Sequence, residues 1–161
     1  MKTLLAAAVL MSAASTAPAL ALDLSKSVTV QAPPATVWQA IGPFCAIGDW
    51  HPAIASCTLS AKGNKKVRTL ELKGGGTIME EQLYRNDAHT MYRYTILKSP
   101  LPVSHYVSTI SVKADGSGST VTWSGHFKAK GATNAKAEDV IGGIYEAGLK
   151  SIADKFGGAG K

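Results

Sequence analysis

The stretch that decides the fold is NAKAEDVIGGIYEAGLKSIADKF, residues 134–156, near the end of the chain. Its apolar residues recur every three or four positions, which is the spacing of one face of an α-helix. Thr133 or Asn134 can cap the N-terminus of this helix. The three glycines inside it would each destabilise a helix by about 1 kcal/mol relative to alanine. We therefore expect a long amphipathic helix that packs closely against a strand, another helix or a ligand.

Seven segments before this helix have the alternation and flanking turns of β-strands. They are residues 24–31, 53–61, 66–72, 77–84, 91–97, 106–113 and 120–128. After the first strand, Val37, Trp38 and Ile41 predict a short helix that Gly42-Pro43 breaks, and a second short helix follows over residues 44–47. This order predicts an α+β helix-grip fold, in which a seven-stranded curved antiparallel sheet surrounds the long C-terminal helix.

The N-terminus has the three parts of an export signal. Lys2 provides the positive charge, residues 4–11 form the apolar stretch, and Ala19-Leu20-Ala21 is a cleavage motif. The apolar stretch is too short to span a bilayer, so we expect no stable membrane insertion. Residues 1–21 are predicted to be a signal peptide and residues 22–161 a single periplasmic or secreted domain. An uncleaved amphipathic helix is the alternative.

Charge and cysteine content narrow the class of protein further. The formal net charge is +6, but the basic residues are scattered, so we expect no nucleic-acid partner and only a weak preference for anionic ligands or partners. The two cysteines, Cys45 and Cys57, predict a disulfide that stabilises an exported domain by roughly 3 kcal/mol, with two buried thiols as the alternative. No motif indicates a metal or a cofactor, and we expect neither.

Strand alternation predicts which side chains face the long helix. Among them are Leu59 on the second strand, Arg68, Leu70 and Leu72 on the third, Met79, Glu81 and Leu83 on the fourth, Tyr92, Tyr94 and Ile96 on the fifth, Tyr106 and Ser108 on the sixth, and Trp123 and Phe127 on the seventh. Turn lengths then predict the register. The predicted cross-strand pairs are Arg68 with Glu81, Glu81 with Tyr94, Tyr94 with Ser108, and Ser108 with Gly125. This polar layer is either a structural salt bridge with a tyrosine partner or a ligand-orienting cluster in an apolar cavity.

Motifs along nearly the whole mature chain carry a family resemblance. They are Val37-Trp38 with Phe44; Asp49-Trp50-His51-Pro52; Arg68; Glu81-Gln82-Leu83; Tyr92 to Ile96; Ser99 to Val103 with Tyr106; Trp123; Phe127; and Tyr145 with Gly148-Leu149. With these motifs the chain resembles the START/birch-pollen-allergen (SRPBCC) superfamily, in the branch of polyketide cyclases, dehydrases and lipid-transport proteins. The resemblance implies a cavity between sheet and helix and gives residues 98–103 the position of a gating loop. It also places His51 where related hormone receptors have a ligand-binding lysine, although a packing role is the alternative for this histidine.

Three functions follow as hypotheses. The first is an exported carrier or sensor for a small hydrophobic or amphipathic ligand. The second is a metal-free cyclase or dehydratase that uses Glu81, Tyr94 or His51 as acid or base, and the third is an accessory protein that docks on a periplasmic redox enzyme. The residues expected to contact a ligand are His51, Arg68, Leu72, Met79, Glu81, Tyr92, Tyr94, Ile96, Tyr106, Ser108, Trp123, Phe127 and Tyr145.

Overall fold

The computed structural model describes residues 21–158, so the predicted signal peptide lies outside the described residues except for Ala21. The elements are β1 (Ala21–Val30), α1 (Pro34–Ile41), α2 (Ile47–Trp50), β2 (Ile54–Lys62), β3 (Lys65–Leu72), β4 (Thr77–Asn86), β5 (Met91–Lys98), β6 (Val103–Asp115), β7 (Gly118–Ala129) and α3 (Asn134–Phe156). The element order and both ends of the long helix are as predicted from the sequence.

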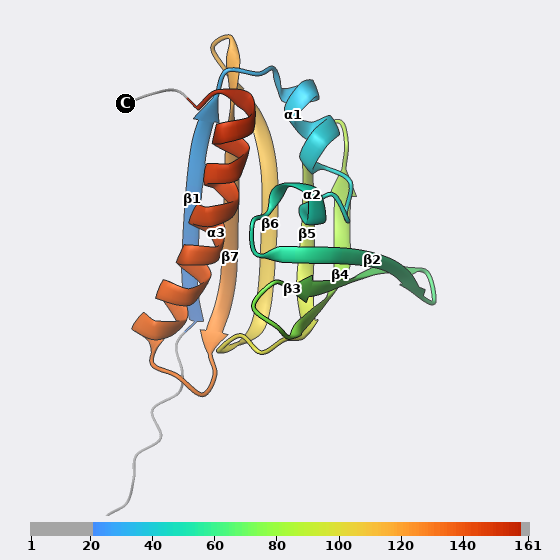
Figure 1. Ribbon diagram of the computed structural model, residues 1–161, viewed down its shortest axis with the longest axis vertical. Coiled ribbons are helices and arrows are strands. Elements are labelled where there is room, and N and C mark those ends of the chain that lie inside the picture. The colour runs from blue at the N-terminus through green and yellow to red at the C-terminus, as the bar shows by residue number, and fades with distance from the viewer. Residues whose placement is uncertain (1–20, 159–161) are drawn as a thin grey trace, which may run out of the picture.

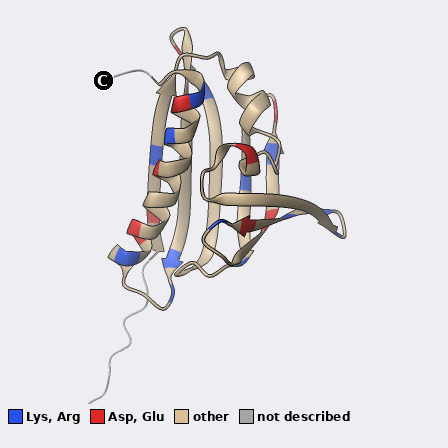
Figure 2. Ribbon diagram, in the orientation of Figure 1, with Lys and Arg blue, Asp and Glu red and all other residues tan. Residues whose placement is uncertain are grey.

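The seven strands form one antiparallel sheet in the order β1-β7-β6-β5-β4-β3-β2. Helix α3 lies along β1 and β7, while α1 contacts β6 and β7 and α2 contacts β2 and α3 (Figure 1). The apolar side chains between these layers form one core. The helix-grip fold predicted from the sequence is therefore confirmed. Lys and Arg are spread over many elements (Figure 2), and no described helix is long and apolar enough to cross a membrane.

Helix α3 begins at a capping threonine, and glycines allow it to pack closely against the sheet. The Thr133 side chain accepts a hydrogen bond from the backbone N–H of Lys136 at its first turn. At Gly148 a β-carbon would lie only 2.7–2.9 Å from three aromatic rings. A β-carbon at Gly125 of β7 would lie 2.2 Å from the hydroxyl of Tyr145 on α3. These two glycines thus let the helix approach the sheet closely, whereas Gly143 faces open space.

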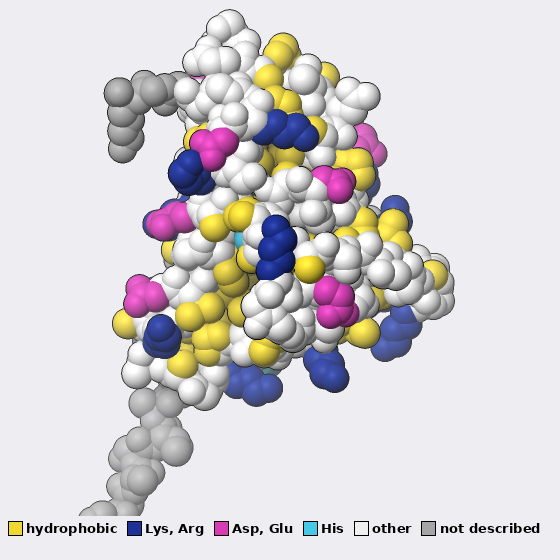
Figure 3. Space-filling view, in the orientation of Figure 1, with side chains coloured by type: hydrophobic (Ala, Val, Ile, Leu, Met, Phe, Trp, Pro, Cys, Tyr) yellow, Lys and Arg dark blue, Asp and Glu magenta, His cyan; other side chains and the backbone are white. Residues whose placement is uncertain are grey.

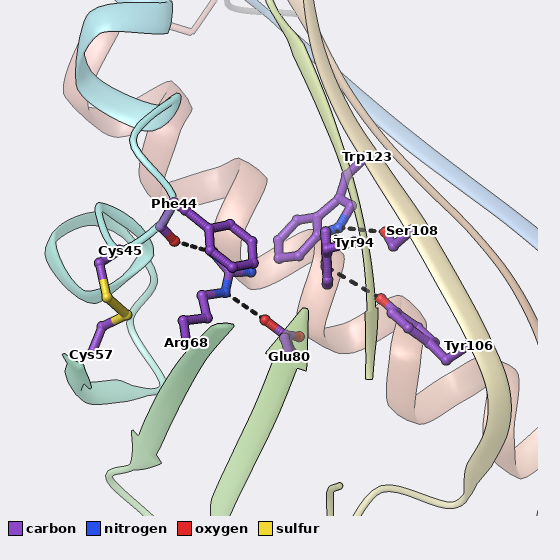
Figure 4. Close-up of polar contacts among 9 residues, drawn as sticks. All are labelled: Phe44, Cys45, Cys57, Arg68, Glu80, Tyr94, Tyr106, Ser108 and Trp123. Carbon is purple, nitrogen blue, oxygen red and sulfur yellow. Dashed lines mark hydrogen bonds and ion pairs between the residues drawn. A yellow bond between two sulfur atoms is a disulfide. The ribbon is translucent and has the colours of Figure 1, made fainter. Parts of the chain in front are cut away.

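The second short helix lies later in the chain than predicted. It spans Ile47–Trp50 rather than residues 44–47, because residues 44–46 form a turn in which the Ala46 N–H donates to the Pro43 carbonyl. A disulfide joins Cys45 in this turn to Cys57 on β2, as predicted. The disulfide and the turn fix the segment that carries Phe44 against the end of the sheet (Figure 4).

The predicted register of the β3–β4 hairpin is wrong by one residue. Arg68 lies opposite Glu80, and Glu81 lies opposite Val67. The turn between the strands is longer than predicted, because the Leu72 N–H donates to the Gly76 carbonyl and Glu71 pairs with Thr77. The inward side chains of β4 are consequently Ile78 and Glu80.

Several predictions on neighbouring strands also fail. Alternation predicts Met79 and Leu83 inside, but they are 38 % and 44 % exposed, and Leu59 on the outermost strand is 50 % exposed. Glu81 pairs with Thr95 rather than with Tyr94. The register from β5 to β7 is as predicted, with Tyr94 opposite Ser108 and Ser108 opposite Gly125.

Candidate functional site

A cavity of about 260 Å³ lies between the sheet and α3. Its volume is slightly below the roughly 300–1,000 Å³ of typical small-molecule sites. The wall residues are Ile47, His51, Ala53, Ile54, Leu70, Leu72, Gly74, Gly75, Ile78, Glu80, Tyr94, Ile96, Leu101, Tyr106, Trp123, Ile141 and Ile144. The wall is mostly apolar, and the space-filling view shows hydrophobic side chains along the strip beside α3 (Figure 3). The β3–β4 turn and the loop that carries Leu101 both contribute to the wall.

A buried ion pair lies at the end of the cavity (Figure 4). Arg68 is fully buried, and its Nε donates to Glu80 Oε2 at 2.6 Å. Its Nη1 donates to the backbone carbonyl of Phe44, and its Nη2 is buried without a partner among the described residues. The guanidinium carbon lies 4.1 Å from the ring centroid of Phe44 and 5.0 Å from that of Tyr94. Aromatic rings and one carboxylate therefore enclose this cation.

Glu80 connects the ion pair to the cavity. Its Oε2 bonds to Arg68, while we find no donor to its Oε1 among the described residues, and Glu80 is a wall residue whereas Arg68 is not. Burial raises the pKa of Glu80, and the positive charge of Arg68 opposes that shift. Arginine remains charged at any physiological pH, so protonating Glu80 would leave a buried cation uncompensated. The carboxylate form therefore faces the cavity at neutral pH.

A chain of buried hydroxyl groups runs from the wall residues Tyr94 and Tyr106 to Tyr145 and Ser108 behind the wall. The Ser108 hydroxyl donates to the backbone carbonyl of Ser124 at 2.7 Å, and a hydroxyl has one proton to donate. In the 3.0 Å contact between Tyr145 and Ser108, the Tyr145 hydroxyl must therefore be the donor. It follows that Tyr106 donates to Tyr145 across 2.6 Å. The Ser124 carbonyl at the end of the chain thus determines the direction of all three hydrogen bonds.

The remaining hydroxyl, that of Tyr94, receives a hydrogen bond but has no good acceptor. The Trp123 Nε1–H donates both to Ser108 and to the Tyr94 hydroxyl, each at 3.0 Å. The next oxygen in reach of the Tyr94 hydroxyl is that of Tyr106, at 3.5 Å, beyond the usual 2.5–3.0 Å of an O–H···O bond. Burial holds the pKa of both tyrosines well above the ordinary value, so both hydroxyls keep their protons.

His51 is held in one neutral form. Its Nδ1 accepts from the Ala53 N–H at 3.2 Å, so the proton is on Nε2, which lies 3.0 Å from the Ile144 carbonyl. Burial lowers the pKa of His51, which favours this neutral imidazole. The ring packs edge-on against Trp123, with centroids 5.9 Å apart. His51 is therefore a hydrogen-bonded packing residue at the cavity wall, with neither nitrogen free.

The family model that describes polyketide cyclase/dehydrase and lipid transport matches residues 21–157. The chain belongs to this family. The protein XoxI from Bacillus cereus has a similar structure, with 38 % identity, a TM-score of 0.79, and coverage of 83 % of this chain and 94 % of that one. An uncharacterised protein from Bacillus thuringiensis has 36 % identity and a TM-score of 0.79, over 84 % and 98 % of the two chains.

The Zhui aromatase/cyclase from a Streptomyces species shares the fold, with a TM-score of 0.69 over 84 % of this chain and 93 % of that one. Its identity of 17 % supports the similarity of fold alone. No curated protein matches the chain. Membership of the family thus agrees with the SRPBCC resemblance of the sequence motifs and leaves the ligand open.

The structure brings six of the expected ligand-contacting residues to the cavity wall. They are His51, Leu72, Tyr94, Ile96, Tyr106 and Trp123. Arg68, Tyr92, Ser108, Phe127 and Tyr145 are buried behind the wall, where they support it. Met79 and Glu81 are not wall residues, and the Glu81 carboxylate instead accepts from the exposed Lys65 at 2.5 Å.

The sequence reasoning missed Glu80 and the apolar groups of α2, α3 and the β5–β6 loop. Glu80 and Glu81 are adjacent, and alternation with Met79 and Leu83 selects Glu81, whereas Glu80 is the wall residue. Ile141 and Ile144 of α3 lie on the apolar stripe of the helix, which is a signal for the core but not for the cavity. Leu101 follows a proline in a loop, where no periodicity applies.

Proposed function

We propose that this protein is an exported binding protein that carries or senses a small apolar or amphipathic molecule. The observation that carries the proposal is the cavity of about 260 Å³, whose wall is apolar except for a few polar groups. A protein interior is normally packed without spaces of this size. Family membership supports the same proposal, because the family description includes lipid transport.

Export is supported by two independent features. The first is the signal-peptide pattern of residues 1–21, and the second is the disulfide between Cys45 and Cys57. Structural disulfides persist in oxidising compartments and are rare in the cytosol. We propose that residues 22–161 act as one domain in the periplasm or outside the cell.

An enzymatic function receives less support from the geometry. Both nitrogens of His51 are bonded, and the tyrosine hydroxyls have pKa values far from neutrality. Glu80 has a raised pKa, as a general base often does, but its negative charge balances Arg68. Each protonation of Glu80 would leave Arg68 uncompensated, which makes acid–base cycling costly. The cavity also argues against a purely accessory role, for which a fully packed interior would be sufficient.

Native mass spectrometry of the mature protein, purified from the periplasm of its own host, tests the proposal. We expect a bound small molecule in the wild type and its loss in Leu72→Trp, which places an indole at the half-buried wall of the cavity. Leu83→Trp is the matched control, because Leu83 is 44 % exposed and is not a wall residue. Bound ligand in both variants, or in neither variant nor the wild type, would contradict the proposal.

A further inference from the structure

The polar groups at the cavity wall define what a ligand must offer. The Tyr94 hydroxyl is the end of the chain described above, and its proton has no acceptor closer than 3.5 Å among the described residues. Its oxygen already receives the Trp123 Nε1–H. Tyr94 is therefore a donor to anything bound beside it. A buried donor without an acceptor is destabilising, and a ligand that supplies the acceptor removes that cost.

Glu80 offers a hydrogen-bond acceptor, where Tyr94 offers a donor. Its Oε1 has no described donor and Glu80 is a wall residue, so this oxygen is an acceptor for a ligand N–H or O–H. Glu80 and Tyr94 both flank the guanidinium of Arg68, to which Glu80 bonds at 2.6 Å and whose carbon lies 5.0 Å from the Tyr94 ring centroid. One donor and one acceptor thus face the same end of the cavity.

The cation beside Glu80 is not accessible to a ligand. Arg68 is fully buried, is not a wall residue, and is paired with Glu80. The other cationic candidate, His51, is neutral, and both its nitrogens are bonded. A ligand carboxylate beside Glu80 would therefore meet a negative charge, whereas Lys73, the cation of the β3–β4 turn, lies close enough to His51 to help lower the pKa of that residue. An ammonium group would suit Glu80 but offers no acceptor to Tyr94.

A hydroxyl group both donates and accepts a hydrogen bond, so it satisfies Glu80 and Tyr94 together. We propose that the cavity selects a neutral apolar molecule that carries a hydroxyl group, an alcohol or a phenol, and discriminates against carboxylates. This inference rests on the proposed function as a binding protein. It differs from the weak preference for anionic ligands that the net charge of +6 indicates, because the groups at the wall and not the scattered surface lysines contact the ligand.

Three probes of similar shape test the selection: 2-naphthol, 2-naphthoate and 2-methylnaphthalene. Titration calorimetry at neutral pH with the delipidated, disulfide-bonded protein measures each dissociation constant. We expect 2-naphthol to bind at least about tenfold more tightly than either other probe, because one satisfied buried polar group is equivalent to a factor of about ten or more.

Tyr94→Phe removes the donor and keeps the ring. Trp123 retains Ser108 as its acceptor, so the fold is expected to persist. This variant should lose the preference for 2-naphthol over 2-methylnaphthalene by about tenfold while its affinity for 2-methylnaphthalene is unchanged. Tyr92→Phe is the matched control, because it removes a buried hydroxyl that has no described partner and lies outside the cavity wall. We expect this control to bind all three probes as the wild type does.

The outcomes separate this inference from the proposed function. If none of the three probes binds the wild type, the proposed function fails and the inference fails with it. If the probes bind but 2-naphthoate or 2-methylnaphthalene equals 2-naphthol, only the inference is overturned. A preference for 2-naphthol that survives in Tyr94→Phe would likewise overturn the assignment of Tyr94 as the donor.

Discussion

Replacing Glu80 with glutamine should destabilise the fold far more than the same change at Glu81. Arg68 is fully buried and its only described carboxylate partner is Glu80, at 2.6 Å. Glutamine keeps the size of the side chain but removes its charge, which leaves a buried cation uncompensated. Breaking a buried ion pair in this way costs about 3–5 kcal/mol.

The neighbouring residue provides a matched control within the same strand. Glu81 is itself buried, but it pairs with Lys65, whose side chain is 55 % exposed, so the charge that remains after Glu81→Gln can be hydrated. Exposed ion pairs contribute about 0–1 kcal/mol. Because a domain of this size loses about 2–4 °C of Tm per kcal/mol, Glu80→Gln should lower Tm by roughly 6–20 °C and Glu81→Gln by at most about 4 °C.

Guanidinium denaturation followed by tryptophan fluorescence measures the free energy of unfolding directly. A double variant, Arg68→Met with Glu80→Leu, removes both charges and should be more stable than Glu80→Gln alone, because apolar replacement of a buried pair is often close to neutral. Equal losses for Glu80→Gln and Glu81→Gln would refute the reasoning, and so would a double variant less stable than the single one. Either result would mean that Arg68 does not depend on Glu80.

Other regions of the chain give three further predictions. Gly148→Ala should destabilise the protein, although alanine favours helices, because its β-carbon would lie within 2.9 Å of three rings. Gly143→Ala faces open space and should stabilise the protein by about 0.5–1 kcal/mol. Thermal denaturation measures both effects. Thiol labelling of the denatured, unreduced mature protein should find no free thiol, and serine at both Cys45 and Cys57 should cost about 3 kcal/mol in chemical denaturation. Burial lowers the pKa of His51, so below pH about 6.5 the unfolded chain binds more protons than the folded chain does. The free energy of unfolding should therefore fall as the pH drops through that value. Urea titrations should show a smaller fall in His51→Gln.

The sequence predicted element bounds and strand register correctly where caps, apolar spacing and turn residues agreed. The α3 helix has a capping threonine, an apolar stripe and a left-handed glycine at Gly157, and its predicted and observed bounds coincide. The hairpin from β6 to β7 has a tight turn over Gly116, so Asp115 pairs with Gly118 and the inward set follows by simple alternation. The sequence alone therefore places Tyr94, Ser108 and Trp123 on one face of the sheet.

The prediction failed where strand pairing is irregular. Strand β4 has two register shifts against β5, one between Met79 and Glu80 and one between Gln82 and Tyr84. Each shift changes the face of the residues that follow, and alternation from one end of a strand cannot detect it. At the end of β3, the Leu72 N–H also donates to the Gly76 carbonyl, whereas the prediction paired Leu72 with Thr77. A one-residue error in this hairpin was enough to exchange Glu81 for Glu80.

The irregular pairings are also what give the cavity its polar end. A similar shift between Ser104 and Val107 of β6 includes His105 in the left-handed region, at φ 53°, and the next side chain, Tyr106, lies in the wall. A bulge redirects one side chain at the cost of local regularity. In β4 the inward carboxylate of Glu80 neutralises Arg68 with one oxygen and leaves the other at the wall. The regular strands thus supply the apolar wall, while the irregular ones determine which polar groups a ligand meets.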